Sequence, residues 1–220
     1  MWRFLFHENI RRFRDRLVDD ISTEQRETLQ RLLAEAEAEL DRFERAATRE
    51  LARDRPDLVQ FAEQAIDEQM TLLRAQFGNL QVFDADLGGL LILAQRNFRS
   101  AFLDHFALVR PDDESACGRC LGDDNPVSIG DVRTDPAFAP HRNVALDAGV
   151  MAVHSSPLHD ASRRFIGVLS AHFNGPRDLS ADEIAASARH AASVGEALSM
   201  RLGARGTGGP PASHGPSAFQ

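Results

Sequence analysis

Two cysteines, Cys117 and Cys120, form the only CxxC spacing in the chain and carry its most reactive side chains. This spacing can bring two sulfurs together at a helix start, for thiol redox chemistry or for metal binding. One pair cannot complete a zinc site, so further ligands would have to come from histidines that the fold brings near: His141, His154, His159 and His172. The alternative is that Cys117 is a small buried hydrophobic residue and Cys120 is incidental. Cys117 and Cys120 are therefore redox candidates, and no metal site is predicted.

The chain lacks the sequence motifs of common catalytic sites. It has no Gly-x-Ser-x-Gly nucleophile elbow, no phosphate-binding loop and no paired-histidine zinc motif. The sequence therefore favours a protein that is not an enzyme.

The composition predicts a soluble, cytoplasmic protein of one core domain with an accessory element. The chain has 220 residues, and no apolar run approaches the roughly 18 residues of a membrane span. An apolar cluster at the N-terminus lacks the cleavage site of a signal peptide. The formal net charge of −8, with arginines interleaved among acidic residues, argues against nucleic-acid binding. Two cysteines are too few for a secreted disulfide scaffold.

Residues 1–55 are predicted to form a helical extension. The segment from Glu8 to about Arg53 is charged, and it carries two apolar stripes at helical spacing. The helices should be separated near Ser22, which with Gln25 has the spacing of a capping box. Neither helix has enough apolar surface to be stable alone, so we expect a helical hairpin or a helix pair in a homodimer.

The remainder of the chain predicts an alternation of helices and strands. Pro56 precedes a helix expected over Asp57–Phe77 and ended by Gly78. Strands are predicted over Asn79–Asp84, Leu90–Gln95 and Pro126–Asp131, short helices over Phe102–Leu108 and Ala116–Leu121, a loop-rich stretch up to Ala148, and a last helix over Ala181–Leu202. Residues 203–220 are rich in glycine and proline and are predicted to be disordered.

The segment from Val150 to Phe173 predicts a buried antiparallel hairpin. Apolar runs at its two ends flank a polar break that contains His159 and Asp160. Gly167, within the second strand, should leave room for a close neighbour.

This order of elements, over about Asp57 to Leu202, resembles a GAF domain, a small-molecule-sensing module. The segments that carry the resemblance are FGNLQVFD (Phe77–Asp84), SACGRCL (Ser115–Leu121), VSIGDVRTDPAF (Val127–Phe138), AGVMAVHSSPL (Ala148–Leu158) and FIGVLSAHF (Phe165–Phe173). The resemblance implies an α+β fold over residues 56–202, with a GAF/PAS-like central antiparallel sheet of about five or six strands. Helices would cover one face, and a ligand-accommodating loop and helix would cover the other.

Strand alternation selects candidate ligand-binding residues on that second face. It separates the polar side chains of the strands from apolar ones such as Leu80 and Leu169. Ser170 and His172 would face the pocket or, alternatively, solvent. Arg142 is a candidate for an anionic group or is a solvated arginine. The full candidate set is Asn79, Gln81, Phe83, Cys117, Arg142, Ser155, Ser170 and His172.

Three functional hypotheses follow from these observations. The first is a non-enzymatic sensor that binds an unknown small ligand and relays the change to a signalling partner protein through helices of a homodimer. The second is a thiol redox switch or reductase that uses Cys117 and Cys120, and the third is a structural dimerising adaptor. The chain has no lysine and so lacks the Asn-Lys-x-Phe signature of cyclic-nucleotide-binding GAF domains; neither cysteine precedes histidine, as in bilin-binding ones. The ligand and any cofactor stay unidentified.

Overall fold

A computed structural model describes residues 2–203 of the chain. Its helices are α1 (Trp2–Val18), α2 (Thr23–Asp54), α3 (Pro56–Leu73), α4 (Ser100–His105), α5 (Ala116–Asp123), the 3₁₀ helix η1 (Ala139–His141), α6 (Arg142–Asp147) and α7 (Ala181–Gly203). Its strands are β1 (Phe77–Asp84), β2 (Gly89–Arg96), β3 (Leu108–Val109), β4 (Val127–Ile129), β5 (Ala152–His159) and β6 (Phe165–Phe173).

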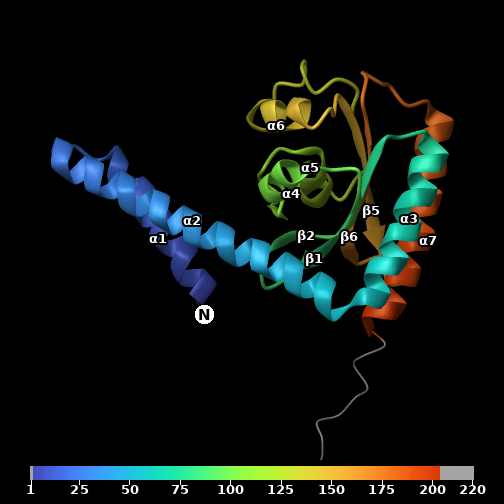
Figure 1. The fold of residues 1–220 in the computed structure, drawn as a ribbon, viewed down its shortest axis with the longest axis horizontal. Helices are drawn as coiled ribbons and strands as arrows, with labels where there is room; N and C mark the ends of the chain where they lie inside the picture. The colour runs from blue at the N-terminus through green and yellow to red at the C-terminus, as the bar shows by residue number, and fades with distance from the viewer. Residues whose placement is uncertain (1, 204–220) are drawn as a thin grey trace, which may run out of the picture.

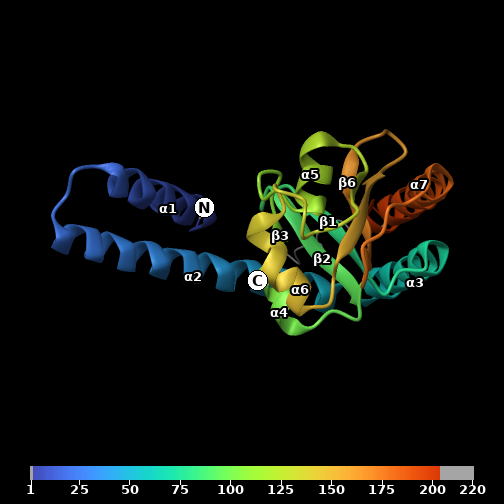
Figure 2. The same ribbon diagram turned by 90° about the horizontal axis from the view of Figure 1, so that it is seen from above.

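The strands form one antiparallel sheet in the order β3-β2-β1-β6-β5-β4. Helices α3 and α7 lie side by side on one face, whereas α4, α5 and α6 lie on the other (Figures 1 and 2). The predicted α+β fold with a central antiparallel sheet is confirmed, and the number of strands is six.

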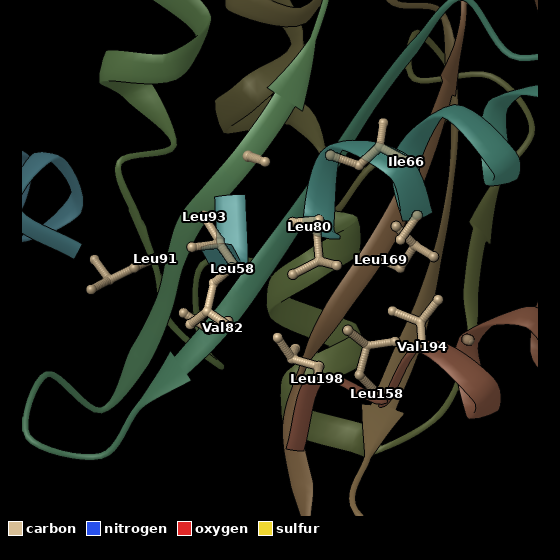
Figure 3. Packing of buried hydrophobic residues seen from close by; sticks show 14 of the residues in the cluster. Leu58, Ile66, Leu80, Val82, Leu91, Leu93, Leu158, Leu169, Val194 and Leu198 are labelled. Atoms are coloured by element: carbon tan, nitrogen blue, oxygen red, sulfur yellow. The ribbon is translucent and has the colours of Figure 1, made fainter. Parts of the chain in front are cut away.

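Leucine-rich packing holds the helix layer of α3 and α7 to the sheet. Leu80 of β1 and Leu169 of β6 are fully buried against Ile66 of α3 and Val194 of α7 (Figure 3). Burying a side chain of this size contributes about 1.5–3 kcal/mol to folding. This cluster fixes which side of each strand faces the helices, and therefore which side faces the opposite layer.

The opposite layer is rich in phenylalanine. The ring of Phe98 stacks on Phe77 at 5.3 Å and on Phe102 at 4.1 Å between centroids, and Phe102 lies 4.7 Å from Phe106. These rings belong to a second buried cluster that includes residues of α5 and α6. Aromatic packing therefore attaches the short helices to the sheet.

The N-terminal helices form the predicted hairpin, and α2 continues into the sheet domain (Figure 1). The capping box is confirmed: Ser22 N donates to Gln25 Oε1 at 3.0 Å, and Gln25 N donates to Ser22 Oγ at 3.2 Å. Only Arg55 separates α2 from α3. Arg55 also donates to the carbonyl oxygen of Arg201 at 2.9 Å, which joins this junction to the end of α7.

The predicted end of the third helix is wrong. Helix α3 ends at Leu73 because Arg74 adopts a left-handed conformation with φ 55°. Gly78, predicted as the helix cap, is instead the second residue of β1. A Cβ there would lie 2.6 Å from Ile66 Cγ2, so this glycine is needed for close packing of the helix on the sheet.

Further differences concern the short elements. The predicted helix over Phe102–Leu108 is α4, which ends at His105, and Leu108 instead pairs with Leu91 of β2 as part of β3. The stretch predicted as loop contains α6. His159, predicted in the hairpin break, belongs to β5. Helix α4, strand β3 and helix α6 are too short to show a hydrophobic period, and only their contacts with the rest of the fold define them.

None of the described helices is long and apolar enough to cross a membrane. Of the tail predicted over 203–220, Gly203 ends α7 and the rest lies outside the described residues.

The pairing of β1 with β6 requires a glycine at position 167, which mutation can test. A Cβ at this position would lie 2.2 Å from the carbonyl oxygen of Gln81, a backbone atom that cannot move aside. We expect Gly167→Ala to lower the free energy of unfolding by about 3 kcal/mol in denaturant titration. Gly175→Ala is the control, because a Cβ there meets nothing within 4 Å. Equal stabilities of the two variants would contradict this packing.

Candidate functional site: a cavity on the sheet face

A small cavity lies between the sheet and the layer that contains α4 and α5. Its volume is about 20 Å³, which is room for about one water molecule. It is lined by strand residues below and by aromatic and small residues above: Asn79, Gln81, Phe102, Phe106, Val109, Ser115, Ala116, Cys117, Phe138, Val150, Val153 and His172.

Strand geometry aims Asn79 and Gln81 of β1 at this cavity. Leu80 and Val82, which alternate with them, are buried in the cluster beneath α3 and α7. The pairing of β1 with β2 shifts register between Leu80 and Gln81, so a bulge lies beside the cavity. Bulges commonly redirect a side chain next to a functional site.

Gln81 is the most unusual polar residue of the cavity. Its side chain is 1% exposed, yet neither its amide nitrogen nor its amide oxygen has a hydrogen-bond partner within the described part of the chain. A buried polar group without a partner costs about 1–3 kcal/mol. Gln81 therefore destabilises the protein unless a molecule in the cavity bonds to it.

His172 adds a second unsatisfied atom. Its Nε2 lies 3.1 Å from Asn79 Oδ1, an oxygen that can only accept, so Nε2 carries the hydrogen. Burial among aromatic rings lowers the pKa of His172 to about 3, so the ring is neutral and its Nδ1 is an acceptor. No described protein group donates to that Nδ1.

Cys117 lies at the edge of the cavity, above a pair of serines. Its Sγ is 3.5 Å from Ser155 Oγ and 3.3 Å from Ser170 Oγ, and the two hydroxyl oxygens are 2.8 Å apart. Burial raises the pKa of the Cys117 thiol and that of the Cys120 thiol, so both are protonated at neutral pH. Neither sulfur has the thiolate character that redox catalysis requires.

A pair of histidines closes the layer above the cavity. His141 of η1 donates from Nε2 to the backbone oxygen of Asp113, which leaves its Nδ1 to accept from His105 Nε2 at 2.9 Å. Asp113 also accepts from the Ser115 hydroxyl at 2.6 Å, and Ser115 caps the start of α5. Polar contacts thus connect α4, η1 and α5 into one lid.

Solved structures share this architecture. A GAF domain/HD domain protein from Geobacter sulfurreducens superposes with a TM-score of 0.55 at 15% identity, over 66% of this chain and 95% of that chain. The GAF domain of a phosphoenolpyruvate-protein phosphotransferase from Coxiella burnetii gives 0.54 at 15%, over 74% and 96%. The sheet domain has the GAF fold.

A third neighbour is an enzyme. The type II free methionine-R-sulfoxide reductase from Thermoplasma acidophilum superposes with a TM-score of 0.51 at 14% identity, over 70% of this chain and 96% of that chain. Identities this low establish the fold alone. No protein-family model matches the chain, and no curated protein sequence matches it either.

Among the predicted binding residues of this GAF fold, four line the cavity: Asn79, Gln81, Cys117 and His172. Ser155 and Ser170 lie directly beneath Cys117 and are buried, and His172 is buried too, so the alternative that Ser170 and His172 face solvent is wrong.

Two predicted residues lie outside the cavity. Phe83 is 38% exposed near the end of β1, where its ring meets Phe165 edge-on at 6.1 Å. Arg142 donates to the backbone oxygens of Val132 and Asp135, both at 3.2 Å, so it holds the loop rather than facing the cavity. Their sequence positions gave no sign of these contacts, which depend on the tertiary fold.

The histidines considered as metal ligands do not converge. His154 lies between the hydroxyls of Ser128 and Ser156, and His159 meets Asp124. Within residues 2–203 no group of three or more His, Cys, Asp or Glu side chains could hold a metal ion.

The sequence analysis did not predict the phenylalanines that line the cavity on the side opposite the sheet. Phe102 and Phe106 of the lid and Phe138 before η1 all line the cavity. Phe98, Phe102 and Phe106 are spaced by four residues, a pattern that predicts a shared face. This spacing could have identified Phe102 and Phe106 as cavity residues from the sequence.

The unsatisfied amide predicts an unusual stability effect. Gln81→Met keeps the length of the side chain and removes both unpaired polar atoms, so we expect the ligand-free protein to gain about 1 kcal/mol in free energy of unfolding. Gln64→Met, the same change on the exposed face of α3, is the control and should be near neutral. A loss of stability at Gln81 would show that its amide is satisfied.

The buried thiols predict low reactivity. In native protein at about pH 8, iodoacetamide should leave both cysteines unmodified, because each is buried and protonated. In denaturant both should be alkylated, which mass spectrometry detects. Rapid modification of either native thiol would restore the redox hypothesis.

Proposed function

We propose that this protein is a non-enzymatic sensory GAF domain that binds a small ligand in the cavity. The observation that carries the proposal is the unpartnered amide of Gln81, 1% exposed and lining the space beneath the lid. Selection for folding alone would disfavour such a residue, since an apolar side chain there avoids the cost. A binding role explains why a glutamine stands at this position.

A change in the cavity can reach the opposite face of the sheet because adjacent residues of one strand contact the two layers. On β5, Ser155 lies under Cys117, whereas its neighbour Ser156 faces the helix layer and contacts Ser187 of α7 at 2.9 Å. Gln69 of α3 donates to the same Ser187 hydroxyl at 2.6 Å. A buried polar contact thus joins β5 to both α3 and α7.

The helix layer in turn meets the N-terminal hairpin. Arg55, between α2 and α3, bonds to the end of α7 through the Arg201 carbonyl, and the Arg201 guanidinium lies 4.1 Å from the Phe61 ring centre. We propose that ligand binding shifts the population of arrangements at this junction and so alters the helices that a homodimer or a signalling partner contacts. Exposed apolar side chains near this end of α7, Met200 at 68% and Leu202 at 37%, support such a contact surface.

A cytoplasmic setting stays part of the proposal, because the two cysteines do not pair as a disulfide. The buried, protonated thiols do not favour the redox switch or reductase. The adaptor hypothesis has one observation in its favour, the small volume of the cavity. An experiment must therefore distinguish the structural adaptor from the ligand-binding sensor.

Native mass spectrometry of freshly purified protein tests the proposal. We expect a dimer with a non-covalent small-molecule adduct, and the same dimer without the adduct for Gln81→Met. Gln64→Met should keep the adduct.

Two outcomes would count against the proposal. A bare dimer that also shows no thermal shift with a panel of metabolites would favour the structural adaptor. If the protein were a monomer at micromolar concentration, relay through a homodimer would be ruled out.

A further inference from the structure

We infer that the cavity selects a small neutral ligand that presents a hydrogen-bond donor beside an acceptor, as the N–H and C=O edge of a lactam does. This inference rests on the proposed sensory function and adds the chemistry of the ligand.

The donor and acceptor requirement comes from Gln81. Its amide offers an N–H donor and a carbonyl acceptor side by side, and both are unused. A partner with adjacent N–H and C=O groups would form two parallel hydrogen bonds with it. A ligand with only donors or only acceptors would leave half of the amide unsatisfied, at the full cost of burial.

The neutral character comes from the lining. None of the cavity-lining residues named above carries a charge, and His172 is held neutral by burial. Two arginines of the layer above the sheet are engaged elsewhere: Arg119 pairs with Asp135 at 3.1 Å, and Arg142 bonds to loop carbonyls. A charged ligand would lose its hydration without gaining a counter-charge, which is strongly unfavourable.

His172 adds a second, separate contact. Its Nδ1 can only accept, and its register partner on β1 is Phe77, four residues from Gln81. The ring of His172 leans toward Asn79, which its Nε2 contacts at 3.1 Å, and Asn79 precedes Gln81 by two residues on the same face of β1, so His172 and Gln81 line one continuous polar side of the cavity. Phe102 and Phe106 also line the cavity and supply aromatic surface, which suits a flat ring.

Entry of such a ring requires the lid to move. The present volume of about 20 Å³ admits about one water molecule, so Phe102 and Phe106 must be displaced. Phe102 lies in α4, a helix of six residues, and Phe106 directly follows its last residue. Displacing them would disturb the stacking of Phe102 on Phe98, so the binding energy of the ligand must offset the cost of that movement.

Three probes test the inference on the full chain labelled with ¹⁵N. 2-Pyridone has the lactam edge, 1-methyl-2-pyridone is the same ring with the N–H blocked, and benzoate is a flat anion. In NMR titrations we expect 2-pyridone to shift the amides of β1 and α4, and the methylated ring to bind at least about tenfold more weakly. Gln81→Met should remove that difference, and Gln64→Met should keep it.

The contrary outcomes are distinguishable. Binding of benzoate at the cavity as tight as that of 2-pyridone, or an unchanged preference in Gln81→Met, would overturn the ligand chemistry and leave ligand sensing intact. No cavity shift with any probe would also overturn it. If native mass spectrometry then showed bare protein, the proposed function would fail as well.

Discussion

The pairing of β1 with β6 at the centre of the sheet is the constraint on which the rest of the structure depends. These strands join the start of the sheet domain to its end, and they pack so closely that Gly167 has no room for a Cβ beside Gln81. Their register decides which side chains face α3 and α7 and which face the lid. A slip of one residue would bury Gln81 beneath the helices and move Leu80 to the cavity.

The two faces of this pair have opposite chemistry. On the helix side, leucines such as Leu80 and Leu169 form an apolar core, in which Gln69 Oε1 is the one buried side-chain polar atom without a partner among the described residues of α3 and α7. On the lid side, polar groups are buried under phenylalanine rings, and several of their atoms have no partner among the described residues. The first face stabilises the fold, whereas the unpartnered atoms of the second lower its stability, a cost that the proposed ligand binding would offset. The strands themselves connect the two, because neighbouring residues point to opposite faces.

The sequence was sufficient for the features that depend on local pattern. The long helices, the capping box at Ser22 and the polar alternation of β1 follow from spacing and residue type, and the structure contains them. The end of α3, the two-residue strand β3 and the contacts of Arg142 depend on tertiary neighbours, which no local period records. The unsatisfied state of Gln81 belongs to this second group, since only the packed fold shows that its amide lacks a partner.

The most direct test of the central claim is a high-resolution crystal structure of protein purified without added ligand. The account predicts electron density for a bound small molecule larger than water within hydrogen-bond distance of both Gln81 amide atoms, with no protein group bonded to either. Density that shows the Gln81 amide bonded to protein groups, or only to a single water in an otherwise filled cavity, would contradict the account.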